Sequence, residues 1–180
     1  MGKKGISNIV HGQVYDSLNY LIVEHSGIAP RSFIEDLFRV FYLNILYLGI
    51  DGPCLLSDKE TLNLLKGFHK KGVSACVKEG FVWIDFEDVP KLIEKDLLIC
   101  EGNALLLKKT PPSKEFIIQR LPELSGFSKD KISSSDAELL DEVLCDNDIY
   151  LHDDFLDCFI VTKSKEIFNL ILEKVKEMSG

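Results

Sequence analysis

The chain has 180 residues, a length that suits one domain of ordinary size or two small subdomains sharing a core. Apolar residues make up 46% of the sequence, which excludes wholesale disorder, and the net charge of −8 disfavours nonspecific binding to nucleic-acid phosphates. The charge is uneven, because residues 1–75 carry eight Lys and Arg against seven Asp and Glu, whereas residues 76–180 carry 13 against 22. The acidic half suits a basic protein partner.

The five cysteines are widely spaced and form no C-x-x-C pair, which predicts reduced, buried thiols and no zinc ribbon. The longest run without charge, residues 40–50, is far shorter than the about 20 residues of a membrane-spanning helix. We therefore expect a cytoplasmic protein with no membrane association.

The first 52 residues are expected to form a helical N-terminal part. Val10, Val14, Leu18 and Leu21 recur at three- and four-residue spacing, which predicts a helix over residues 8–26. A second helix is expected from Pro30 to about residue 48, with an apolar back half that must be buried in the core or against a partner. The aromatic candidates for partner binding are Phe33, Phe38, Phe41 and Tyr42.

Residues 53–110 are expected to form a second part, with helices at 58–71 and 86–95 and short strands at 73–77, 81–84, 97–100 and 104–108. The helix at 86–95 and the hairpin after it, with Glu101-Gly102-Asn103 at its tip, resemble the recognition helix and wing of winged-helix domains. The resemblance implies a DNA-binding regulator, whose candidate phosphate contacts are Lys66, Lys70, Lys71, Lys108 and Lys109. However, the expected recognition helix carries Glu87, Asp88 and Glu94 against Lys91 and Lys95, which favours a protein partner over DNA.

Residues 111–180 are expected to form an acidic α/β part. Helices are predicted from Ser113 to about 121, from the capping box at Ser135 to Leu144, and over 164–178. Strands are predicted at 149–151 and 158–161.

An acidic run lies between residues 136 and 157, where nine carboxylates occur without a single Lys or Arg. Carboxylate clusters bind Mg²⁺ or Mn²⁺. The spacing of Asp85, Glu115, Asp136 and Asp153 along the predicted elements resembles the acidic residues of PIN-like ribonucleases. That resemblance implies a metal site that activates water for phosphodiester attack.

The sequence therefore predicts a helix-rich α+β fold, with a helical N-terminal part and a winged-helix-like or small mixed-sheet C-terminal part, as one compact unit. No G-x-S-x-G, H-E-x-x-H or P-loop motif occurs. The function that we expect is a non-enzymatic interaction module or accessory subunit without a cofactor, which binds a protein partner or itself. A metal-dependent nuclease and a DNA-binding regulator remain as alternatives.

Overall fold

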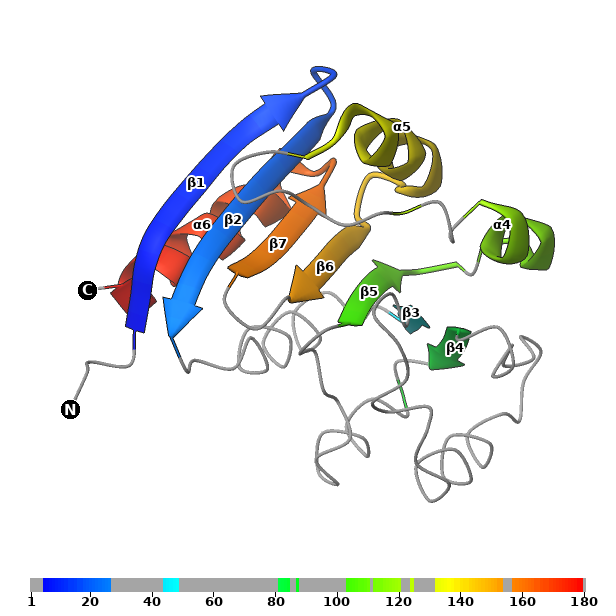
Figure 1. Ribbon diagram of the computed structural model, residues 1–180, viewed down its shortest axis with the longest axis horizontal. Coiled ribbons are helices and arrows are strands. Elements are labelled where there is room, and N and C mark those ends of the chain that lie inside the picture. The colour runs from blue at the N-terminus through cyan, green and yellow to red at the C-terminus, as the bar shows by residue number, and fades with distance from the viewer. Residues whose placement is uncertain are drawn as a thin grey trace.

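The computed structural model describes residues 5–26, 44–48, 81–84, 87, 103–110, 112–120, 124, 132–153 and 157–179. Within these residues, seven strands form one antiparallel sheet in the order β1-β2-β7-β6-β5-β3-β4 (Figure 1). The strands are β1 (Gly5–Val14), β2 (Leu18–Ser26), β3 (Asn44–Leu48), β4 (Phe81–Ile84), β5 (Asn103–Lys108), β6 (Ile149–Asp153) and β7 (Asp157–Thr162). The helices in the same residues are α4 (Lys114–Gln119), α5 (Ser134–Val143) and α6 (Lys165–Ser179).

The N-terminal residues form a hairpin, so the helix predicted over 8–26 is wrong. Strands β1 and β2 pair along their length, from Gly5 with Ser26 to Val14 with Leu18. Leu21, Ile22 and Val23 of β2 are all buried, because the strand is covered on both faces, and such a continuous apolar run fits a buried strand and a helix face alike. The turn holds Tyr15 and Asp16 at φ of 55° and 53°, and it contains no Gly to mark it in the sequence.

The second predicted helix is also wrong where the structure describes it. Residues 44–48 are strand β3, which lies between β4 and β5. Residues 30–43, and the helices predicted at 58–71 and 86–95, lie outside the described residues apart from Glu87. The described fold is α+β and dominated by its sheet, which corrects the expectation of a helix-rich protein with a helical N-terminal part.

The winged-helix expectation fails at strand β5. A wing would pair residues 104–108 with residues 97–100 in a hairpin, but β5 has β3 on one edge and β6 on the other. Both ladders extend over nearly all of β5, from Ala104 to Leu107 on each side. A strand has only two edges, so this one cannot form the wing.

The helices and strands predicted for residues 111–180 are confirmed. Helices α4, α5 and α6 and strands β6 and β7 all occur close to their expected bounds. The N-cap of α5 is Ser133, two residues before the predicted one, and its hydroxyl accepts a hydrogen bond from the Asp136 N–H at 3.2 Å. These helices carry caps and a 3.6-residue apolar period, and both signals are local.

The two faces of the sheet are covered by different helices. Helix α5 packs on one face, where its Ala137 and Leu140 lie in one apolar cluster with Leu18, Tyr150 and Val161 of the sheet. Helix α6 packs on the opposite face against β1, β2 and β7 (Figure 1). No helix in the described part of the chain is long and apolar enough to cross a membrane.

The tip of the N-terminal hairpin is attached to α5 through one carboxylate. The Ser17 hydroxyl donates to Asp141 Oδ1 at 2.8 Å, and Lys163 Nζ lies 3.2 Å from the same oxygen. The hydrogen bond from Ser17, and then the one from Lys163, lower the pKa of Asp141 below its usual 3.8. Asp141 thus joins the hairpin, α5 and the turn between β7 and α6.

We predict that Ser17→Ala destabilises the protein at neutral pH by about 0.5 kcal/mol, a small effect because the Asp141 side chain is 43% exposed. A lowered carboxyl pKa stabilises the folded state only while the carboxylate is ionised. The difference from wild type should therefore be present above the unfolded pKa near 3.8 and disappear as pH falls through the lower folded pKa. Urea unfolding at several pH values measures it. Ser134→Ala, an exposed serine of α5, is the control and should show no such pH dependence.

Candidate functional site

The four carboxylates predicted to hold a metal have different surroundings. Glu115 is exposed in the first turn of α4, whereas Asp136 is fully buried at the start of α5. Asp153 lies in β6 opposite Asn103 and Cys158, but its side chain, like all of Asp85, is outside the described residues. In the part of the chain that is described, no group of three His, Cys, Asp or Glu is positioned to hold a metal ion. The metal site stays a prediction.

Of the lysines predicted to contact phosphate, Lys108 lies inside the protein. Its side chain is 4% exposed, and its ammonium donates to the Val143 carbonyl at 2.6 Å and to the Asp148 carboxylate. This charge is therefore used by the fold and is not presented to a ligand, contrary to the expectation. Lys109 is exposed. Lys66, Lys70 and Lys71, and the aromatic candidates Phe33, Phe38, Phe41 and Tyr42, lie outside the described residues.

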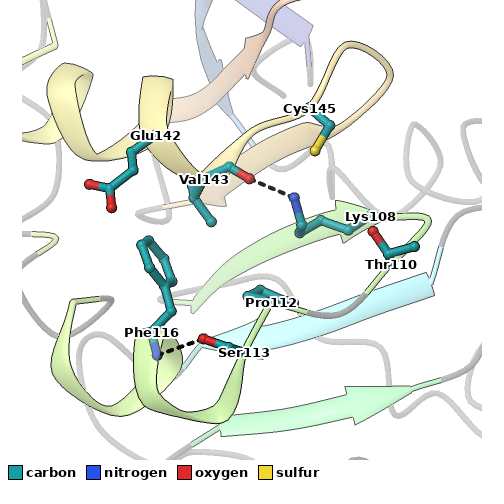
Figure 2. A pocket seen from close by; sticks show the side chains of 8 residues that line it. All are labelled: Lys108, Thr110, Pro112, Ser113, Phe116, Glu142, Val143 and Cys145. Atoms are coloured by element: carbon teal, nitrogen blue, oxygen red, sulfur yellow. Dashed lines mark hydrogen bonds between the residues drawn. The ribbon is translucent and has the colours of Figure 1, made fainter.

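A pocket of about 250 Å³ lies beside Lys108, between the end of β5, helix α4 and the end of α5 (Figure 2). Its apolar wall is formed by Pro112, Phe116 and Val143, and Figure 2 shows the Phe116 ring extending from α4 toward α5. The other lining residues are Lys108, Thr110, Ser113, Glu142 and Cys145.

Local contacts fix the wall that α4 supplies. The Ser113 hydroxyl caps α4 by accepting the Phe116 N–H at 3.2 Å. At the other end of α4, Arg120 pairs with Glu142 of α5 at 2.9 Å. Phe116 itself is half-buried against the cluster under α5. The short helix is therefore capped at its start and joined to α5 at its end by an exposed ion pair, with its aromatic side chain facing the pocket.

The floor of the pocket rests on the buried Lys108–Asp148 pair. Asp148 also accepts the Cys145 N–H at 2.7 Å, and Thr162 Oγ1 donates to its backbone carbonyl at 2.9 Å. Buried charges are tolerated only when they are paired and hydrogen-bonded, as these are. The charges of Lys108 and Asp148 cancel, and Glu142, the other charged residue that lines the pocket, is paired with Arg120 in an exposed ion pair.

Sequence reasoning missed this pair because its members are 40 residues apart. One signal was available, since Lys108 ends an apolar run, Leu105-Leu106-Leu107, that reads as a buried strand. A lysine in such a place needs a buried counter-ion. The sequence does not say which of the many carboxylates supplies it.

The pocket is suited to holding one side chain. Its volume lies below the range of about 300–1,000 Å³ that small-molecule sites usually occupy. The Cys145 thiol is exposed and is not part of a disulfide, and with the Ser113 and Thr110 hydroxyls it offers polar contacts at the rim. The arrangement can therefore hold an apolar group in an open depression and hydrogen-bond the backbone that carries it.

Lys108→Met is predicted to destabilise the protein by about 3–5 kcal/mol, because it leaves the Asp148 carboxylate buried without its cation. Adding Asp148→Asn should recover part of that loss, since the second change removes the orphaned charge. Urea unfolding gives both values. Lys165→Met, at an exposed lysine of α6, serves as control and should stay within about 0.5 kcal/mol of wild type. Equal losses at positions 108 and 165 would contradict the role of the pair.

Comparison with known proteins returned no match, whether with protein-family models, with curated proteins or with solved structures. What the site does is therefore argued from its geometry.

Proposed function

We propose that the protein is a non-enzymatic interaction module, of the kind found as an accessory subunit, that binds an apolar side chain of a basic partner segment in the pocket between α4 and α5. The observation that carries the proposal is the pocket itself, which combines an apolar wall from Phe116, Val143 and Pro112 with the Glu142 carboxylate. Protein interfaces obtain most of their binding energy from a few such anchors in pockets, surrounded by contacts of small effect.

The charge around the pocket supports a basic partner. Glu138, Glu142 and Asp146 are exposed on α5 and the turn after it, the same segment that supplies Val143 and Cys145 to the pocket. They belong to the run of nine carboxylates without Lys or Arg between residues 136 and 157. A field of one sign steers an oppositely charged partner and raises its association rate.

The Arg120–Glu142 pair can give way to a partner at small cost. The two side chains are 41% and 51% exposed, and exposed ion pairs contribute about 0–1 kcal/mol. A Lys or Arg of the partner can therefore take the place of Arg120 beside Glu142. The buried Lys108–Asp148 pair stays unchanged in such an exchange and keeps the floor of the pocket in place.

A selection from a random peptide library displayed on phage, with the wild-type protein as bait, tests the proposal. The enriched peptides should carry an apolar residue flanked by Lys or Arg. Glu142→Lys should weaken their binding about fivefold, which corresponds to about 1 kcal/mol, as measured by fluorescence anisotropy. Glu173→Lys makes the same charge change on an exposed position of α6, across the sheet, and should leave the affinity unchanged.

A second pair of variants tests the pocket separately from the charge. Cys145→Trp fills the pocket from an exposed position and should abolish binding, whereas Asp146→Trp changes the adjacent exposed residue, which does not line the pocket. Peptides that bind both position-145 and position-146 variants as tightly as wild type would show that the pocket is not the binding site.

A further inference from the structure

We propose that two copies of the protein associate through β1, whose open edge pairs antiparallel with the β1 of the second copy and joins the two sheets. This interface is separate from the pocket, because β2, β7 and β6 lie between β1 and β5 in the sheet. Dimerisation through β1 and binding at the pocket can therefore be tested separately.

Strand β1 is at the end of the sheet, and among the described residues its partner strand is β2 alone (Figure 1). It is 10 residues long, whereas strands in globular proteins usually have about 5–6. An edge strand turns a row of backbone N–H and C=O groups away from the sheet, and these groups can pair with another strand.

The sequence of β1 lacks the features that usually protect an edge. Residues 5–14 contain no Lys, Arg, Asp, Glu or Pro. The ladder with β2 has one irregularity, between Ile6 and Asn8, and is regular from Asn8 to Val14. Ile9 and Val10 are only half-buried, so the strand also has apolar surface left to cover. The seven residues from Asn8 to Val14 form the regular part of the edge, along which a second strand can pair.

The charge distribution favours a second copy over the basic partner proposed for the pocket. Each chain carries a net charge of −8, so two copies repel each other across most of their surfaces. At β1 they meet without bringing one carboxylate opposite another, since the strand contains none. A basic segment, in contrast, finds no carboxylate on β1 to attract it. The uncharged strand therefore suits an identical uncharged strand.

With a two-fold axis at His11, the centre of the regular segment, all of residues 8–14 pair with the same residues of the second copy. Antiparallel partners point to the same face, so Val10 of one copy would lie opposite Gly12 of the other, and His11 opposite His11. Gly12 has a specific reason to lack a side chain, because a Cβ there would lie 2.6 Å from Tyr20 Oη. The Tyr20 ring thus extends over β1 to the edge, where Val10 of the second copy would cover it.

Sedimentation velocity across a concentration series, up to about 100 μM, tests the association. Wild type should form dimers. His11→Lys places two cations opposite each other at the axis and should raise the dimer dissociation constant at least about tenfold. His11 is exposed, but its ring contacts that of Phe168 on α6 at a centroid distance of 6.2 Å, so circular dichroism must first show that the variant folds. Asn169→Lys, an exposed position on α6, is the charge-matched control and should dimerise as wild type does.

Disulfide trapping tests the pairing itself. Directly opposed residues have Cβ atoms about 4.5–5.5 Å apart, so His11→Cys should form a linked dimer on mild oxidation. Gln13→Cys would lie about 13 Å from its own copy in this register and should link no faster than wild type, which retains the exposed Cys145. A monomeric wild type, equal dimerisation of the two lysine variants, or equal linking at positions 11 and 13 would each overturn the proposal.

Discussion

The buried ion pair between Lys108 and Asp148 is the interaction on which the position of α5 depends. The end of a helix leaves carbonyl groups without helical partners, and here the Lys108 ammonium donates a hydrogen bond to the carbonyl of Val143. The same ammonium holds Asp148, which in turn accepts the Cys145 N–H. One lysine of the interior strand β5 therefore fixes the last turn of α5 and the chain that leads into β6. The floor of the pocket follows from this arrangement.

The last turn of α5 is also held by a weaker set of contacts of the same kind, through Asp141. The Asp141 carboxylate accepts a hydrogen bond from the Ser17 hydroxyl of the hairpin and forms an ion pair with Lys163 in the turn after β7. Because Asp141 is more exposed than Asp148, this attachment contributes less to stability. It also depends on pH, since the hydrogen bonds from Ser17 and Lys163 lower the pKa of Asp141. The helix thus joins three segments far apart in the chain. It presents its exposed carboxylates on the side that faces away from the sheet, while its apolar side completes the core.

The sequence predicts the C-terminal half well and the N-terminal half poorly, for a physical reason. Helices α5 and α6 have local caps and a strong apolar period, so local reasoning finds them. The spacing of Val10, Val14 and Leu18 fits a helix and a strand pair alike. What decides between them is the pairing of β2 with β7, about 140 residues away, as in Asn19 with Thr162. The Lys108–Asp148 pair could not be predicted for the same reason. A lysine at the end of an apolar run indicates a buried counter-ion, but the sequence does not say which carboxylate supplies it.

The acidic C-terminal half and the uncharged β1 both affect which molecules can associate with the protein. A surface rich in carboxylates keeps identical chains apart in most orientations, while it attracts basic partners. An edge strand without charge is then the place where two copies can meet with the least repulsion, and the shared two-fold axis limits such pairing to a closed dimer. The pocket beside β5 stays accessible in the proposed dimer, because β2, β7 and β6 separate β5 from β1. In the assembly that we propose, the uncharged β1 joins two copies and the acidic segment beside each pocket attracts a basic partner, so that one dimer displays two pockets.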